Sequence, residues 1–212
     1  MKTNLKTKQL VIMGLLTAIL ILMAYTPLGY LNVGPLAITF NVIPVAIAAV
    51  VLGPLGGAII GGIFGLTSFL QCFGGSALGT ALFAVSPPLT VVQCFIPRII
   101  DGLIIGFIAN TLKKKGVNAP IASAIVGFLA AFLNTLLYMS SLVILFGNSD
   151  IIKSYRDSIA PGKNVFIFVC LFVGVNAIAE MISSTIITSA ICAALNKAKL
   201  IGGFKKKEIS AE

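Results

Sequence analysis

The chain has 212 residues, of which 58% are hydrophobic and only 10% charged, and its mean hydropathy is +1.08. Ordinary soluble domains carry about 25% charged residues, so this composition excludes a soluble enzyme core and indicates an integral membrane protein. The net charge is +9, and most of the Lys and Arg residues form a few basic clusters. This distribution predicts contact with membrane lipid at one surface and argues against a nucleic-acid partner.

Hydrophobic runs separated by Pro, Gly and charged residues predict six transmembrane helices. The second run is short for a full crossing and is joined to the third only by Gly53 and Pro54. The length leaves no room for a separate soluble domain, so we expect residues 1–212 to form one all-α membrane domain. The predicted segments are approximately 9–26, 40–53, 55–72, 87–112, 119–147 and 164–196.

Eleven of the fifteen Lys and Arg residues lie before the first segment, between the fourth and fifth, and after the sixth, whereas three lie between the fifth and sixth and Arg98 lies within a segment. Because cytoplasmic loops carry an excess of Lys and Arg, this distribution predicts that both termini are cytoplasmic. This orientation places two uncharged connections on the outer side of the membrane, residues 27–39 and 73–86. Both contain several Gly and Pro residues. We predict that they bend over a cavity as lids, with simple flexible linkage as the alternative.

One charge interrupts the apolar sequence. Residues 9–97 contain no Lys, Arg, Asp or Glu, and Arg98 ends this run inside a predicted helix. A charge at membrane depth costs about 2.5–3.5 kcal/mol on insertion scales, so Arg98 indicates a ligand or a buried partner. At 1.5 Å per residue from the outer helix ends, Arg98, Asn134 and Asn176 reach a common depth of roughly 16–20 Å. We predict that they line an outward-opening pocket between the last three segments.

Further polar residues extend this predicted substrate site. Tyr138 shares a helix face with Asn134 and lies one turn closer to the outside, whereas Glu180 lies one turn deeper than Asn176. Gln71 and Gln93, near the outer ends of their helices, are expected at the rim.

The alternative to a ligand site is a structural ion network. Arg98 and Asp101 are three residues apart and can neutralise each other on one helix face, and Glu180 can supply a second carboxylate. In this alternative the buried charges serve the fold and bind no ligand.

Catalytic and metal chemistry find little support in the residues. The chain has no His and lacks the paired carboxylates of hydrolytic sites, so we expect no enzyme activity. No P-loop motif occurs, so transport would need energy from a partner. Because its four cysteines are widely separated, we interpret them as packing residues and predict no metal site.

Small residues recur at four-residue spacing and allow neighbouring helices to approach closely. Gly14 and Ala18 in the first segment lie at the expected edge of the bundle, where a small stripe can dock another subunit. The remaining small residues predict packing inside the bundle: Gly53, Gly57, Gly61, Gly65, Gly102, Gly106, Gly127 and Ala131.

Several short motifs, in this order, resemble the substrate-binding S component of an energy-coupling factor (ECF) transporter. The similarity extends over essentially the whole chain and is greatest to the pantothenate type. It implies a six-helix vitamin-binding subunit of the bacterial cytoplasmic membrane, without a cofactor of its own. The motifs are the first helix with its basic flank and small residues, the segment from Asn41 to Gly53-Pro54-Leu55-Gly56-Gly57, Pro97-Arg98 with Gly102 in the fourth span, and Asn134-Thr135 in the fifth.

The resemblance also implies partners. A membrane coupling subunit would be driven by two ATPase subunits that hydrolyse ATP. Docking would use Gly14 and Ala18, where the family has an A-x-x-x-A pattern, so this chain departs from the pattern at the first position. The lid role of residues 27–39 and 73–86 also matches the family.

Pantothenate fits the predicted pocket because it is an anion with an amide and two hydroxyls. Arg98 would hold the carboxylate, and Asn134 and Asn176 would bond the amide or hydroxyl groups. Another vitamin such as folate or riboflavin is the alternative substrate. An autonomous secondary transporter or channel is the alternative class of protein, against which stand the lack of an evident inverted repeat and the few ionisable groups.

Overall fold

The computed structural model describes residues 5–27, 29–33, 36–198 and 200–201, which form a helical bundle with one short β-hairpin. Five helices, α1, α2, α4, α5 and α7, are long and apolar enough to cross a membrane. The elements are α1 (Leu5–Ala24), β1 (Tyr30–Val33), β2 (Leu36–Thr39), α2 (Val42–Gln71), α3 (Ala77–Val85), α4 (Pro87–Lys114), α5 (Ala119–Phe146), α6 (Asp150–Ile159) and α7 (Val165–Lys197).

Helix α2 covers both the second and the third predicted segments and folds back on itself at Gly53. The backbone there has φ 78° and ψ −162°, a conformation that favours glycine, and Pro54 follows. A Cβ atom on Gly57 would lie 3.2 Å from the Cβ of Ala49, eight residues earlier. Since eight residues of straight helix span about 12 Å, the two halves of α2 must lie side by side.

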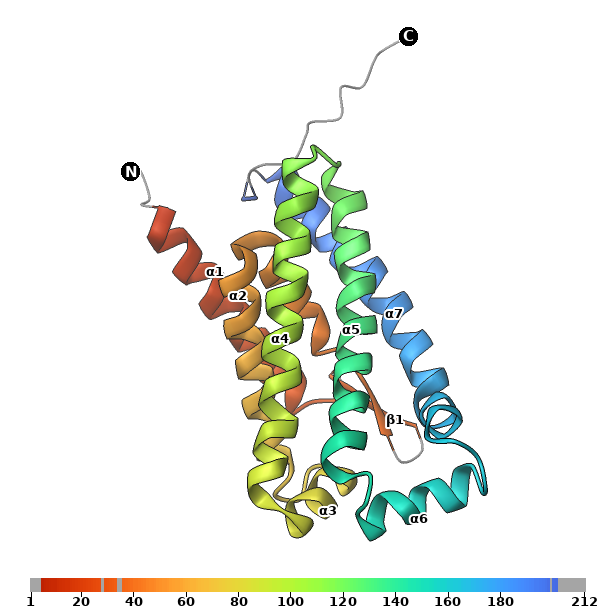
Figure 1. Ribbon diagram of the computed structural model, residues 1–212. Coiled ribbons are helices and arrows are strands. Elements are labelled where there is room, and N and C mark those ends of the chain that lie inside the picture. The colour runs from red at the N-terminus through yellow and green to blue at the C-terminus, as the bar shows by residue number, and fades with distance from the viewer. Residues whose placement is uncertain (1–4, 28, 34–35, 199, 202–212) are drawn as a thin grey trace.

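The long helices run along one another, and the two ends of the bundle differ (Figure 1). The start of α1, the α4–α5 connection and the end of α7 lie at one end, called here the closed end. Helices α3 and α6 and the β1–β2 pair lie toward the other, called the hairpin end. The first half of α2 is central, with residues 42–50 all buried and contacts from α2 to α1, α4, α5 and α7. A helix buried on every side must be apolar all round, as this sequence is.

The second half of α2 packs antiparallel against α4 through glycines. A side-chain carbon on Gly57 would overlap the carbonyl group of Gly102, and one on Gly61 would overlap the carbonyl group of Arg98. Such close approach gives dispersion contacts that lipid chains cannot replace. The helix that carries Arg98 is therefore held firmly against α2.

The connections at the hairpin end contain secondary structure beyond the predicted loops. Strands β1 and β2 pair antiparallel, with Tyr30 opposite Thr39. The connection after α2 holds α3, whose first turn is capped by the Ser76 hydroxyl accepting from the Gly79 amide at 3.1 Å. Helix α6 starts in the same way, with the Ser149 hydroxyl accepting from the Ile152 amide. Side-chain caps explain why such short helices form.

Candidate functional site

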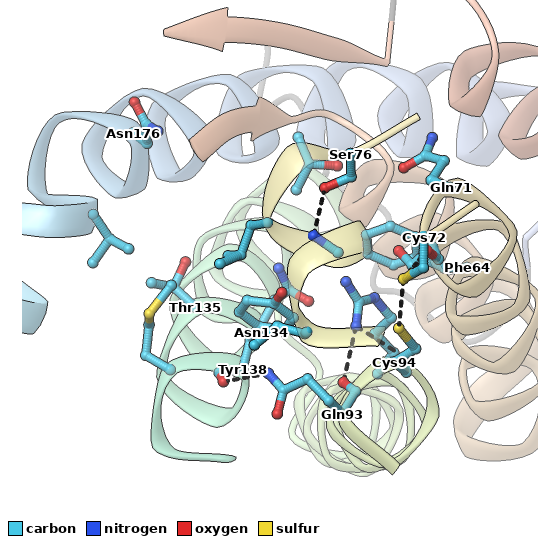
Figure 2. Close-up of a pocket in the computed structure, with 18 of the residues that line it drawn as sticks. Phe64, Gln71, Cys72, Ser76, Gln93, Cys94, Asn134, Thr135, Tyr138 and Asn176 are labelled. Carbon is cyan, nitrogen blue, oxygen red and sulfur yellow. Dashed lines mark hydrogen bonds between the residues drawn. The ribbon is translucent and has the colours of Figure 1, made fainter. Parts of the chain in front are cut away.

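A cavity of about 140 Å³ lies at the hairpin end, between α2, α3, α4, α5 and α7. A cavity of roughly 150 Å³ admits a benzene-sized molecule, so the space is sufficient to begin enclosing a small ligand. Figure 2 shows polar side chains from several helices arranged around it. All six residues predicted to bind substrate line this cavity, although their role in binding stays a prediction: Gln71, Arg98, Asn134, Tyr138, Asn176 and Glu180.

Arg98 is held in the cavity wall, and its Nε donor is unused. Its side chain is only 9% exposed, and Nη1 donates to the backbone oxygens of Cys94 at 2.9 Å and Gln93 at 3.3 Å. The guanidinium carbon lies 4.6 Å from the Phe64 ring centroid and 5.0 Å from that of Tyr138. Cation–π contacts of this kind favour a guanidinium that has lost its water. The Nε donor is buried and has no hydrogen-bond partner.

Among the described residues, the structure shows no ion pair of the kind that the alternative, a buried ion network, requires at Arg98. Within the described residues, the ion pairs lie on α6, where Lys153 contacts Asp150 and Arg156 contacts Asp157. Arg98 is the only cation among the described residues that line the cavity, and neither Asp101 nor Glu180 forms an ion pair with it. A buried cation without an acidic partner is the arrangement expected for a site that receives an anion.

Two buried acceptors in the same wall also lack partners. The Asn134 side chain is 6% exposed and its Oδ1 accepts no hydrogen bond, and the same is true of Oε1 of the fully buried Gln93. The Gln93 amide is oriented by its other end, since Nε2 donates to the Tyr138 backbone oxygen at 2.9 Å. An unpaired buried acceptor costs about 1–3 kcal/mol, so these two atoms indicate where a ligand can supply donors.

Two of the predicted site residues have partners that hold neighbouring elements in place. Nε2 of Gln71 donates to the backbone oxygen of Ala24 at 2.7 Å, which ties the end of α2 to the end of α1. Oε1 of Glu180 accepts from the Thr39 amide at 2.7 Å, which ties β2 to α7. Glu180 therefore links the end of the 27–39 connection to the cavity, and Gln71 links the end of α1 to it.

Several cavity residues give no clear signal in the sequence. Phe64 is one apolar residue in an apolar helix, and nothing in its spacing shows that it faces Arg98. Gln93, expected at the rim, has no exposed surface. Thr135 and Ser76 also line the cavity; the Asn134-Thr135 motif contains Thr135, whereas nothing in the sequence indicates Ser76.

The predicted docking residues lie on α1 and do not line the cavity. Gly14 and Ala18 are both exposed, and a side-chain carbon on Gly14 would meet no atom within 4 Å. Space for a partner is therefore present on this face, and docking through it stays a prediction.

Comparisons of sequence relate the chain to known transport proteins. The model of the family described as "ECF transporter, substrate-specific component" matches residues 8–192. The pantothenate transporter PanT of Leuconostoc mesenteroides subsp. mesenteroides is 36% identical over 200 residues, covering 89% of this chain and 92% of that protein. The pantothenic acid transporter PanT of Lactococcus lactis subsp. cremoris is 26% identical over 205 residues, covering 92% and 96%.

A solved structure shows the same fold. The crystal structure of the S component for biotin from an ECF-type ABC transporter matches with a TM-score of 0.57 over 96% of this chain and 97% of that chain. At 21% identity, this match shows the fold alone. With the match to the family model over most of its length, the chain belongs to the substrate-specific S components of ECF transporters, a family of membrane transport proteins rather than enzymes.

Proposed function

We propose that this S component binds pantothenate from outside the cell for ATP-driven import. The observation that carries the proposal is Arg98, a buried guanidinium with an unused donor in a cavity whose described residues offer it no ion pair. Two similar proteins, at 36% and 26% identity, are named as pantothenate transporters, which favours this anion among the vitamins.

The unpaired atoms of the cavity complement the functional groups of pantothenate. Arg98 would hold the carboxylate through charge-assisted hydrogen bonds, which are about twice as strong as neutral ones. Asn134 Oδ1 and Gln93 Oε1 are acceptors and need donors, which the two hydroxyls and the amide N–H of pantothenate supply. Asn176, on helix α7, would bond the amide oxygen of pantothenate, the polar group that remains.

The other predicted site residues would shape the cavity. The Tyr138 ring supports the guanidinium from one side and would confine the apolar part of the ligand. Gln71 and Glu180, through their bonds to Ala24 and to the Thr39 amide, would position the first outer connection over the entrance.

We infer that the chain crosses the bacterial cytoplasmic membrane six times as one domain, the two halves of α2 being separate crossings. The basic residues of the closed end support cytoplasmic termini, because positive charge accumulates on that side. Contact with lipid would be made around the apolar faces of the outer helices. The closed-end basic residues within the described chain include Lys8, Lys113, Lys114, Lys115 and Lys197.

The chain would depend on partners for energy. We propose that a transmembrane coupling subunit docks on α1 at Gly14 and Ala18, and that two ATPase subunits hydrolyse the ATP. The chain itself would carry no cofactor. Copurification with an ATPase pair would support this arrangement, and transport by the isolated chain along an ion gradient would overturn it.

The direct test is binding of labelled pantothenate to the purified protein. Arg98→Ala should weaken binding by at least about 30-fold, because removing one member of a buried charge pair costs 2–5 kcal/mol. Arg156→Ala, in an exposed ion pair on α6, is the matched control and should bind as the parent does. Unchanged affinity in Arg98→Ala would remove Arg98 from the site.

A vitamin panel tests the identity of the substrate. A ligand that binds only the folded state raises its thermal stability by mass action. Pantothenate should raise the melting temperature, whereas biotin, folate and riboflavin should not. Stabilisation by one of those vitamins in place of pantothenate would overturn the assignment of the substrate.

A further inference from the structure

Two thiols lie close together in the cavity wall. Sγ of Cys72, just after the end of α2, is 4.0 Å from Sγ of Cys94 in α4, and both residues line the cavity (Figure 2). Their side chains are 3% and 5% exposed. Of the other two cysteines, Cys170 is exposed and Cys192 is buried, and neither lines the cavity.

The packing of α2 on α4 explains why these thiols meet. A side-chain carbon on Gly65, two turns before Cys72, would lie 2.8 Å from the Cys94 backbone oxygen, so the two backbones are almost in contact. Helical side chains lean toward the N-terminus of their own helix. Because α2 and α4 are antiparallel, Cys72 and Cys94 lean toward each other.

We propose that Cys72 and Cys94 are a redox modification site that forms an intramolecular disulfide and thereby weakens substrate binding. A disulfide has an S–S length of about 2.05 Å, so the sulfurs must approach by roughly 2 Å, which side-chain rotation and a small backbone shift can provide. Both residues line the cavity, which offers a small reagent a route toward their sulfurs that most buried thiols lack.

The oxidant is a small disulfide, RSSR, and the exchange proceeds in two steps. One cysteine loses its proton, and its thiolate attacks a sulfur of RSSR, forming a mixed disulfide and releasing RS⁻, which takes up the proton. The second cysteine loses its proton in the same way, and its thiolate attacks the sulfur of the first cysteine. This step forms the Cys72–Cys94 bond and releases the second RS⁻, which takes up the proton as RSH. Two protein thiols are oxidised, and one RSSR is reduced to two RSH.

Both sulfurs lie beside groups that shape the cavity. The backbone oxygen of Cys94 accepts from Arg98 Nη1 at 2.9 Å, so a shift of Cys94 changes the position of the guanidinium. Cys72 Sγ packs on α3, where a side-chain carbon on Gly79 would lie 2.9 Å from it. The disulfide would pull both walls from these positions, which is why we expect weaker binding. This effect rests on the proposed function, whereas formation of the bond does not.

The bond is tested in the full-length protein with Cys170→Ser and Cys192→Ser, which retains only the cavity pair. Incubation with 2-hydroxyethyl disulfide should remove both free thiols and lower the intact mass by about 2 Da, as loss of two hydrogens requires. Peptide mapping should find Cys72 linked to Cys94, and a reducing agent should restore both thiols. Two free thiols, or two separate mixed disulfides, would overturn the proposal.

The effect on binding is measured on the same variant before and after oxidation. The dissociation constant for pantothenate should rise by about tenfold, a change equivalent to 1.4 kcal/mol, and should recover on reduction. A variant with Cys72→Ala and Cys94→Ala should show the same affinity with and without oxidant. An unchanged constant in the disulfide form would overturn the effect on binding. If the reduced protein binds no pantothenate at all, the proposed function fails while the peptide map still decides the bond.

Discussion

Helices α5 and α7 are in contact at the closed end and separated by the cavity at the hairpin end. A side-chain carbon on Gly127 would lie 2.5 Å from the backbone oxygen of Ser184, whose hydroxyl donates to the Gly127 oxygen at 2.8 Å. About two turns closer to the hairpin end on each helix, Asn134 and Asn176 line the cavity instead. Small residues let the backbones meet, and larger polar residues hold them apart. The size of residues along one helix face thus decides where the bundle is closed and where it can hold a ligand.

The α2–α4 contact provides the fixed wall for that cavity. The backbone oxygen that a side chain on Gly61 would overlap belongs to Arg98 itself. The charged residue therefore sits on the closely packed interface of α2 and α4, while its side chain reaches the cavity. Substitutions in closely packed contacts should damage the fold, and substitutions in the cavity should damage binding.

The largest effect is expected where the backbones touch. In Gly102→Leu the new side chain would overlap the backbone of Gly57 and force α2 from α4. Overpacking typically costs 1–3 kcal/mol and more where the backbone must move, so we expect most folded protein to be lost. The monodisperse fraction in size-exclusion chromatography measures this. Gly14→Leu, on the open face of α1, is the control and should fold normally; an equal yield from both variants would contradict the expectation.

The cavity end is tested by Asn134→Ala. The substitution removes an acceptor proposed to bind pantothenate, so affinity should fall by about tenfold or more, in line with 1–3 kcal/mol. The melting temperature of the unliganded protein should hardly change, because Oδ1 has no partner to lose. Ser123→Ala removes another unpaired buried oxygen on α5, outside the cavity. It should leave the affinity for pantothenate, measured by titration, unchanged. A similar loss in both variants would show that polarity in the cavity has no special role.

The turn at Gly53 is tested by Lys113→Met. The Lys113 amine donates to the backbone oxygen of Val50, one of the carbonyls freed where α2 folds back. A cation at a helix C-terminus and its hydrogen bond contribute about 1 kcal/mol, so thermal unfolding should shift downward by a few degrees. Lys114→Met, at an exposed neighbouring position, controls for loss of charge. Equal melting temperatures in the two variants would rule out a capping role for Lys113.

The smallest effect is expected for Ser184→Ala. Its hydroxyl joins α7 to α5, but interhelical hydrogen bonds of this kind average about 0.6 kcal/mol in membranes. The close backbone contact at Gly127 remains, so the unfolding temperature should fall by less than in Lys113→Met. A larger fall would mean that the hydrogen bond, rather than the small residues, closes this end.

Some of these features follow from local sequence. Gly53 and Pro54 mark the break in α2 because few other residue pairs suit such a turn. The β1–β2 pair, α3 and α6 were not expected as elements, because short apolar or polar runs do not distinguish loops from short helices and strands. The secondary structure of the connections was therefore known only from the structure, whereas the long helices were predicted from the sequence.

By itself, the sequence determined the membrane class and the long apolar helices, and it located Arg98, Asn134 and Asn176 at a shared depth. It could do so because helical rise converts sequence position directly into depth. Only the tertiary structure decided that Phe64 faces Arg98, that Gln93 is buried with a free acceptor, and that Cys72 meets Cys94. Those contacts depend on how each helix is rotated and packed against its neighbours, and in a chain apolar on nearly every face no periodic pattern specifies that rotation.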